Sequence, residues 1–374
     1  MIRRFPPFAG LLLLMALWAP PSAPAQTPSA LIDSLGRALT DGHPGAAVIG
    51  VVAEGERSVR GFGAVDSSGA PPTAQTLFEI GSVTKTFTGL LLADAIERGL
   101  MQPDDPLRSF LPDSLAWSAP DGAPITLAQL ATHRSGLPRL PSNLQASALA
   151  NPQDPYANYS VRDLHAFLDG YTPPRAPGAG YTYSNLGTGL LGHVLAHRAD
   201  TSFAALVQSR IADPLGLSDT RIDLTSEQQS RFAQGHTASG APTAPWHFPA
   251  LGGAGALRAT PADMLTYVEA HLTASDDSPL GRAMLRAIAP HDSTSRASTQ
   301  IGYGWHITSR SSEHTVVWHN GGTGGFSSFV GFNRVANRGV VVLASTAIGS
   351  DVTAAGFTLM EALLSTADPA SDQP

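Results

Sequence analysis

The sequence predicts a mixed α/β (α+β) fold in which N- and C-terminal segments form one antiparallel sheet, flanked by helices, with a mostly helical lobe inserted between them. Two observations carry this prediction. Runs of apolar and β-branched residues occur near both ends of the chain, whereas the middle alternates helical segments with Pro- and Gly-rich loops. Sheets and helices must bury their apolar faces against other elements, so terminal strands are most simply joined in one sheet.

The chain begins with a stretch typical of a secretion signal. Residues 3 and 4 are arginines, residues 8–18 form an apolar run, and residues 23–25 read Ala-Pro-Ala, with a small residue on either side of proline. This order defines a cleavable signal peptide, and the apolar run is too short to anchor the chain in a bilayer. We therefore expect residues 1–25 to be a signal peptide cleaved near Ala25, and the mature protein to be periplasmic or secreted, without a stable membrane anchor.

The remaining elements follow from periodicity and from the positions of Gly and Pro. The α/β part is expected over about 26–103 and 246–365, the helical lobe over about 104–245, and a flexible tail over 366–374. The expected strands are 46–53, its hairpin partner 59–65 across Gly55, then 314–318, 326–332 and 339–345. The expected helices are 29–40, 83–98, 125–132, 161–169, 187–197, 203–211 and 351–364.

Composition excludes some partners. The chain has 374 residues, a formal net charge of −7 and no cysteine. A chain of this length buries a core large enough to be stable in an oxidising compartment without disulfides. Because basic residues are not clustered, we expect no nucleic-acid partner. We also expect a monomer.

The first candidate motif is a Ser-x-x-Lys tetrad formed by Ser82 and Lys85, at the start of an apolar, alanine-rich stretch. Positions three apart share one helix face, so the hydroxyl and the amine point the same way. A serine hydroxyl becomes an effective nucleophile when a neighbour takes its proton. Taken alone, the tetrad is common and favours a helix cap beside a solvated lysine. Two later motifs reverse that interpretation.

The second motif is Tyr183-Ser184-Asn185, which follows a Gly- and Pro-rich loop. A phenol can shuttle a proton if a nearby cation lowers its pKa, and we expect Lys85 to supply that cation. The amide of Asn185 can donate to a substrate carbonyl. The same residues also suit a helix N-terminus capped by Ser184 or Asn185, and both interpretations can hold at once.

The third motif is His319-Asn320-Gly321-Gly322, expected to follow directly after a strand that ends at residue 318. Its glycines would let a substrate lie against the strand edge. A backbone N–H two or three residues beyond His319 could complete an oxyanion hole with the N–H of Ser82. The simpler alternative is a glycine-rich hairpin turn with an incidental histidine, and taken alone this alternative is favoured.

In this order and spacing, the three motifs resemble the penicillin-recognising serine hydrolases, and more narrowly the class C β-lactamase and D-alanyl-D-alanine carboxypeptidase branch. The similarity extends over nearly the whole mature chain, and residues 76–106, 130–138, 251–260 and 303–305 also look like family segments. The resemblance implies the β-lactamase/transpeptidase-like fold and an exported enzyme that acts on β-lactams or D-amino-acid amide bonds through an acyl-enzyme. It also implies a small-molecule or peptide substrate and no cofactor or metal.

The resemblance also implies residue roles. Ser82 would be the acylated nucleophile, and Lys85 and Tyr183 the acid/base pair. Asn185 would hydrogen-bond to Lys85 and orient the substrate. The backbone N–H groups of Ser82 and Gly322 would form the oxyanion hole, and His319 and Gly321 would complete the substrate-binding strand.

The third motif departs from the class C pattern, because His319 stands where those enzymes have lysine. A His-x-Gly motif is more typical of peptidase, D-aminopeptidase and esterase relatives. An esterase or D-aminopeptidase on the same fold therefore stays an alternative, as does a penicillin-binding protein that acylates without turnover. Since histidine titrates near pH ~6.5, we expect a pH–rate limb at the titration of His319.

Two further patterns are set aside. Residues 81–86 superficially resemble a phosphate-binding loop but lack its glycine spacing. His193 and His197 lie four apart on an expected helix, which is a spacing that can bind zinc, but no third ligand is apparent. We interpret this pair as packed or solvated histidines.

Overall fold

The computed structural model describes residues 28–115, 123–309 and 314–367. The predicted signal peptide and most of the predicted tail lie outside these residues. The described part holds an eight-stranded sheet in the order β2-β1-β10-β9-β8-β7-β6-β5, with antiparallel neighbours throughout. The strands are β1 (Ala46–Ala53), β2 (Glu56–Gly63), β5 (Asp292–Ser293), β6 (Thr299–Ile301), β7 (His306–Ser309), β8 (Thr315–Gly322), β9 (Ser327–Asn333) and β10 (Arg338–Ala344).

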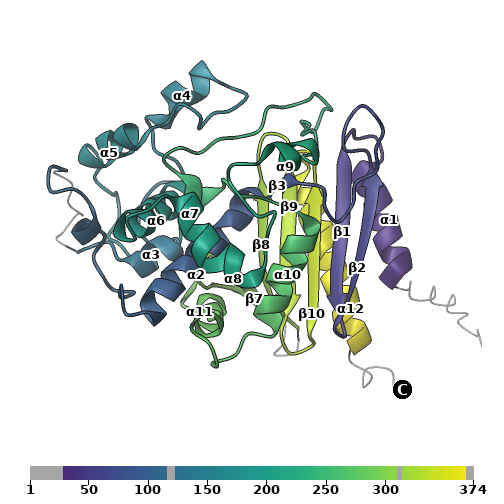
Figure 1. Cartoon of the computed structure of the whole chain (residues 1–374). Coiled ribbons are helices and arrows are strands. Elements are labelled where there is room, and N and C mark those ends of the chain that lie inside the picture. The colour runs from purple at the N-terminus through teal and green to yellow at the C-terminus, as the bar shows by residue number, and fades with distance from the viewer. Residues whose placement is uncertain (1–27, 116–122, 310–313, 368–374) are drawn as a thin grey trace, which may run out of the picture.

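The sheet joins the two ends of the chain, as predicted. Figure 1 shows the purple N-terminal strands beside the yellow C-terminal ones, and the register pairs Ala47 with Ala344. The hairpin between β1 and β2 turns at Glu54 and Gly55, whose φ angles are 56° and 82°. Two successive positive φ angles are the requirement of a type I′ turn, which matches the twist of the strands on either side.

Helices cover both faces of the sheet, so its central strands are buried throughout. One face of β1 and β10 packs in a cluster with α1 and α12, and the other packs with α2 and α10. The long helices are α1 (Pro28–Thr40), α2 (Thr84–Glu97), α5 (Val161–Asp169), α6 (Asn185–Arg198), α10 (Pro261–Leu272), α11 (Pro279–Ile288) and α12 (Gly349–Ala367).

Shorter elements complete the helical part and the segments next to it. A two-stranded sheet pairs β3 (Phe78–Glu79) with β4 (Arg258–Ala259). The short helices are α3 (Leu127–Ala131), α4 (Leu144–Ala150), α7 (Phe203–Val207), α8 (Asp213–Leu215) and α9 (Ser226–Ser230). Single turns of 3-10 or π geometry are η1 (Gly81–Val83), η2 (Leu107–Phe110), η4 (Gln208–Ala212) and η5 (Gly252–Ala254).

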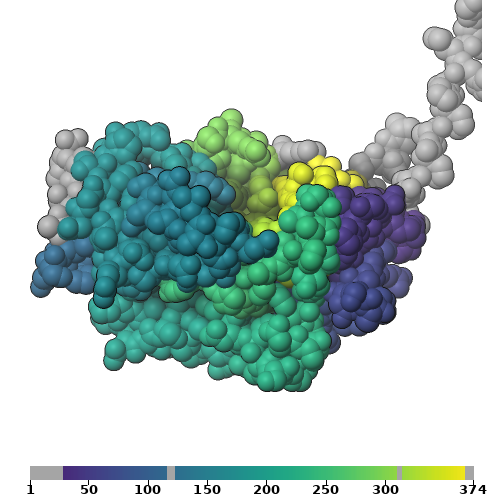
Figure 2. Space-filling model, turned by 90° about the horizontal axis from the view of Figure 1, so that it is seen from above, coloured from purple at the N-terminus to yellow at the C-terminus, as the bar shows by residue number. Residues whose placement is uncertain are grey.

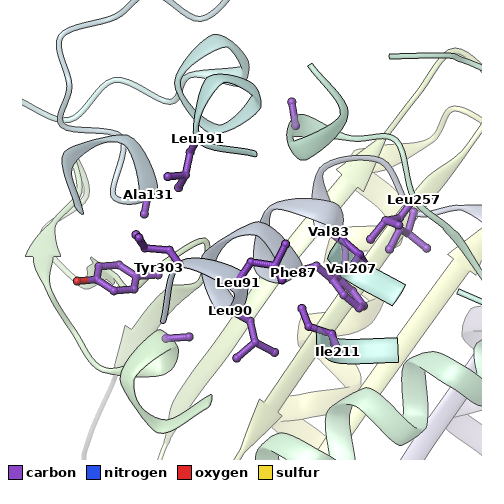
Figure 3. Close-up of a cluster of buried hydrophobic side chains, with 14 of the residues drawn as sticks. Val83, Phe87, Leu90, Leu91, Ala131, Leu191, Val207, Ile211, Leu257 and Tyr303 are labelled. Carbon is purple, nitrogen blue, oxygen red and sulfur yellow. The ribbon is translucent and has the colours of Figure 1, made fainter. Parts of the chain in front are cut away.

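Helix α2 is the centre of the helical part. Its first eleven residues are buried, which is the pattern of a helix that is packed on all sides. Figure 3 shows Leu90 and Leu91 of α2 among the apolar side chains of other elements, including Leu191 of α6 and Ile211 of η4. Any polar side chain on this helix must therefore find its partners inside the protein.

One expected boundary is wrong in a way that matters for the site. The strand predicted over 314–318 is β8, which continues through Gly322. His319-Asn320-Gly321-Gly322 is thus part of the strand and not a turn after it, because β9 supplies ladder partners as far as the pair Gly322–Ser327. Of the residues described, none forms a helix with the length and apolar character needed to cross a membrane.

Candidate active site

The nucleophile candidate and its lysine meet as the spacing predicts. Ser82 lies in η1 and Lys85 in the first turn of α2. The Lys85 Nζ donates to Ser82 Oγ at 3.0 Å and to the main-chain oxygen of Ala254 at 2.6 Å. The Lys85 side chain is fully buried. The amine is therefore held by two oxygens inside the protein, one of which is the candidate nucleophile.

Burial changes the acid–base character of this lysine. It holds the pKa of Lys85 well below its ordinary value, and the positive charge of Arg139 lowers that pKa further. Desolvation disfavours the charged form of an amine, and a second cation does the same. A neutral amine keeps a lone pair that can accept the Ser82 hydroxyl proton across the same 3.0 Å contact. Lys85 is thus suited to act as a general base.

Close backbone contact between η1 and β8 brings two amides to the nucleophile. Gly81 has a φ of 49°, and a Cβ at that residue would lie 2.6 Å from the nitrogen of Gly322. A Cβ at Gly321 would lie 2.1 Å from the Ile80 oxygen and 2.9 Å from the Ser82 nitrogen. Glycine is needed at both positions, because any side chain would push the two segments apart. The backbone nitrogens of Ser82 and Gly322 consequently lie where η1 and β8 are in close contact.

Tyr183 lies half-buried against the nucleophile. Its side chain interacts with Ser82, and its ring centroid lies 5.0 Å from Lys85 Nζ. The ring of His133 packs at 4.5 Å, and His133 Nδ1 accepts the N–H of Ser184 at 3.2 Å, which fixes the backbone beside the tyrosine. Burial raises the pKa of Tyr183, more than Ser82 and Arg139 lower it. The expectation of a lowered pKa is therefore wrong, and the hydroxyl holds its proton at neutral pH.

Asn185 does not make its expected hydrogen bond to Lys85. The Asn185 Nδ2 donates to the Tyr156 hydroxyl at 3.1 Å, and Oδ1 is buried without a partner. Lys85 instead donates to the main-chain oxygen of Ala254 from η5, which lies in the family-like segment 251–260 to which the sequence analysis gave no role. The capping interpretation of this motif is confirmed, since Ser184 Oγ accepts the N–H of Gly187 at 2.8 Å at the start of α6.

His319 is buried and does not line the cleft. Its exposed fraction is 1%, its Nδ1 contacts the oxygen of Asn320 at 2.5 Å, and its Nε2 has no partner. Burial lowers the pKa of His319 well below its ordinary value, and the nearby His306 and Lys85 lower it further. The expectation that His319 titrates near pH ~6.5 is therefore wrong, because its pKa is lower, and the imidazole is uncharged at neutral pH.

A cleft of about 660 Å³ opens beside Ser82. Figure 2 shows a hollow between the teal helical region and the yellow C-terminal elements. The residues that line the cleft come from the three motifs and from other segments: Ser82, Arg139, Tyr181, Tyr183, Thr294, Ser295, Arg296, Thr299, His306, Trp318, Asn320, Gly321, Gly322, Gly349, Ser350 and Thr353. The structure thus brings Ser82, Tyr183, Gly321 and Gly322 together at one cavity.

Several of these residues were not singled out from the sequence. Arg139 directly follows the segment 130–138 that resembles the family, and its main-chain oxygen accepts the N–H groups of Asn185 and Leu186 at 2.9 and 3.2 Å. Its guanidinium carbon lies 5.1 Å from the Tyr183 ring centroid. Arg296 lies in the connection between β5 and β6, where no motif marks it.

The sheet of terminal strands and the buried Ser82–Lys85 pair define one class of protein. A family model described as Beta-lactamase matches residues 31–363 of this chain. The chain therefore belongs to the β-lactamase family, as its resemblance implied. This membership confirms the prediction of an enzyme of the serine hydrolase class.

Curated relatives carry two kinds of name. A Beta-lactamase of Escherichia coli (strain K12) is 29% identical over 316 residues, which cover 74% of this chain and 77% of that protein. The D-alanyl-D-alanine-carboxypeptidase/endopeptidase AmpH of the same organism is 26% identical over 316 residues, covering 81% of this chain and 79% of that protein. The relatives therefore leave the choice between the two activities open.

Solved structures show the same fold. A Beta-Lactamase/D-Alanine Carboxypeptidase from Pseudomonas syringae superposes with a TM-score of 0.78 at 21% identity, covering 91% of this chain and 99% of that chain. D-alanine Carboxypeptidase AmpC from Burkholderia cenocepacia gives a TM-score of 0.75 at 26% identity, covering 91% and 100%. The predicted fold class is confirmed.

Proposed function

We propose that this chain is an exported serine hydrolase that forms an acyl-enzyme at Ser82 and acts on β-lactams or D-amino-acid amide bonds. The observation that carries the proposal is the 3.0 Å contact between Ser82 Oγ and the buried amine of Lys85. A neutral amine beside a serine hydroxyl is the activation that acyl transfer requires. The names of the relatives support the substrate classes.

In the proposed acylation, Ser82 Oγ attacks the scissile carbonyl carbon while Lys85 takes the hydroxyl proton. The N–H groups of Ser82 and Gly322 stabilise the oxyanion that develops. The C–N bond then breaks as Tyr183 gives its proton to the leaving nitrogen, and the proton on Lys85 restores the phenol. The raised pKa of Tyr183 supports this order, because the phenol holds a proton in the resting enzyme.

In the proposed deacylation, a water oxygen attacks the carbonyl carbon of the Ser82 ester. Lys85 and Tyr183 again receive and return the proton, which frees the carboxylic acid and the serine. Asn185 orients the substrate from α6, and its unpaired Oδ1 supports a role as acceptor for a substrate N–H.

The test compares the mature chain with its Ser82→Ala variant. Both are exposed to a chromogenic cephalosporin and to a fluorescent penicillin, and the intact mass is recorded. We expect a covalent adduct on the unsubstituted protein and none on Ser82→Ala, with unchanged thermal unfolding. Labelling that persists in Ser82→Ala would refute the assignment of the nucleophile.

The same experiment separates the alternatives within the family. Rapid Ser82-dependent turnover would define a β-lactamase. A stable adduct with little turnover would define a peptidase, an esterase or a penicillin-binding protein that β-lactams trap, and D-Ala peptides and simple esters would then be compared.

Export and a monomeric state are part of the proposal. The basic, apolar and small-residue order of residues 1–25 supports export. We expect the N-terminus of the mature protein near residue 26, which sequencing of the exported protein checks. Light scattering of the purified protein tests the monomer, and a mass of about two chains would contradict it.

A further inference from the structure

The charge of the cleft comes from arginine alone. Two arginines line it, Arg139 and Arg296, both with exposed side chains. Among the residues that the structure describes, no Asp or Glu lines the cleft and no Lys does either. A cavity lined by one sign of charge attracts ligands of the opposite sign. The cleft is therefore built for an anionic ligand.

The third motif supplies none of this charge. His319 is buried and does not line the cleft, although its ring packs 6.1 Å from that of Tyr183 and 5.1 Å from that of His306, and its neutral imidazole offers no cation at neutral pH. Strand β8 presents Asn320, Gly321 and Gly322 to the cleft instead. A substrate carboxylate must consequently find its positive partner outside β8.

The two arginines are not equivalent. The Arg139 guanidinium lies on the face of the Tyr183 ring, which holds it at the acid/base pair. Arg296 lies in the connection between β5 and β6 and lines the cleft from there. Figure 2 shows the light-green segment that contains it at the rim of the hollow. Burial raises the pKa of Tyr181 and lowers that of His306, two residues joined by a 3.1 Å hydrogen bond, and the charge of Arg296 acts on this cleft wall by opposing the first shift and adding to the second.

Arg296 is left available for a ligand. The acid closest to it along the chain, Asp292, pairs with Arg134 at 3.0 Å. Over residues 28–115, 123–309 and 314–367, no carboxylate lies within ion-pair distance of Arg296. The Thr294 hydroxyl beside it donates to the main-chain oxygen of Thr299 at 2.8 Å, and the Thr299 hydroxyl pairs with that of Thr308. The hydroxyl of Ser295 also lines the cleft and can donate to a carboxylate.

We propose that Arg296 is the specificity-determining residue of this enzyme, binding a free carboxylate of the substrate. The guanidinium matches a carboxylate in two parallel hydrogen bonds, which a histidine or lysine on β8 would not reproduce. This inference rests on the proposed function at Ser82. It favours an amide or lactam that carries a carboxylate over a neutral ester.

The test uses two substrates that differ only in charge. One is an N-acetyl-D-alanyl thioester of thioglycolate, and the other is its carboxamide twin. The released thiol is measured with a disulfide reagent, and the protein gives no background because the chain has no cysteine. Arg296→Gln is compared with Arg296→Lys and with Arg60→Gln. Arg60 is an exposed arginine on β2, at the opposite edge of the sheet, and its substitution removes the same charge.

We expect Arg296→Gln to lower kcat/KM about 10- to 100-fold for the carboxylate substrate and less than about twofold for its twin. Arg296→Lys should recover part of the loss, and Arg60→Gln should leave both substrates unchanged. An unchanged ratio between the two substrates in Arg296→Gln would overturn the proposal. An equal drop in Arg60→Gln would also overturn it, because the cause would then be net charge.

A binding measurement keeps this inference separate from the mechanism. In a Ser82→Ala background, calorimetry compares N-acetyl-D-alanyl-D-alanine with its C-terminal amide, with and without Arg296→Gln. If Arg296→Gln weakens binding of the carboxylate ligand but not of its amide, the result supports Arg296 as the carboxylate-binding residue, even if the proposed acyl-enzyme at Ser82 fails its own test. If both proteins bind the two ligands equally well, the role of Arg296 in carboxylate binding is overturned, even if Ser82 is the nucleophile.

Discussion

Arg139→Gln is the sharpest test of how Lys85 becomes a base. Arg139 is exposed, and its contacts to α6 use its main-chain oxygen, so the substitution keeps these contacts and removes the charge together with the guanidinium contact to the Tyr183 ring. The Lys85 amine and the Arg139 guanidinium lie 5.0 and 5.1 Å from the same ring centroid. They are therefore no more than about 10 Å apart.

This distance sets the size of the effect. At about 10 Å, Coulomb's law gives a shift of about 0.3 pH unit in the dielectric of water and about one unit at the effective permittivity near a protein surface. The sign follows from the charge. Arg139 lowers the pKa of Lys85, so its removal raises that pKa, and the amine becomes protonated at a higher pH.

The assay is the pH dependence of kcat/KM, which reports the free enzyme. The neutral carboxamide thioester is used, so that substrate charge does not contribute. We expect the acidic limb of Arg139→Gln to move upward by about 0.3–1 unit at low salt, and to move less at high ionic strength, where exposed charges are screened. Arg60→Gln is the control. A limb that stays in place at low salt, or moves downward, would refute the role of Lys85 as the base.

Three further predictions follow from buried groups. Lys85→Ala should lower the acylation rate about 10²- to 10⁴-fold in stopped-flow labelling, and normal rates would require another base. His319→Gln should leave the shape of the pH–rate profile between about pH 6 and 8 unchanged, because the imidazole stays neutral there, and a limb lost on substitution would contradict its burial. Burial lowers the pKa of His271 to about 4. The unfolded state therefore binds a proton that the folded state excludes, and stability should fall as pH drops from about 6.5 to 4, by up to about 3 kcal/mol. His271→Leu should lack this loss of stability between about pH 6.5 and 4. Denaturant unfolding should therefore give free energies of unfolding for the variant and the unsubstituted protein that diverge as pH falls, and parallel pH dependences would contradict the prediction.

The sequence predicts those elements whose signals are local. The strand over 46–53 and the helix over 161–169 match β1 and α5 at both ends. The first is a continuous apolar run, and the second begins with a capping box formed by Ser160 and Asp163. The predicted strand over 314–318 ends four residues before β8 does. Asn320, Gly321 and Gly322 have low strand propensity and adopt the strand through their pairing with β9.

The candidate site also has features that the sequence predicts and features that depend on the tertiary structure. The motifs identify Ser82, Lys85 and Tyr183 from spacing and residue type. The directions of their pKa shifts follow instead from burial, which depends on how α2 is surrounded by the rest of the chain. Arg296 lies in a polar segment without any motif, and only the path of the sheet edge past the cleft places it near Ser82.

The pairing of β1 with β10 has a consequence for biogenesis. Ala46 is tied by a hydrogen bond to Ser345, 299 positions later. Contacts of such separation form late, because the long intervening loop must close first. The proposed oxyanion hole is divided in the same manner, with one amide from Ser82 and the other from Gly322. A ribosome-bound or C-terminally truncated chain would hold the serine but not the second amide, so hydrolytic activity should arise only after the last strands have emerged and joined the first.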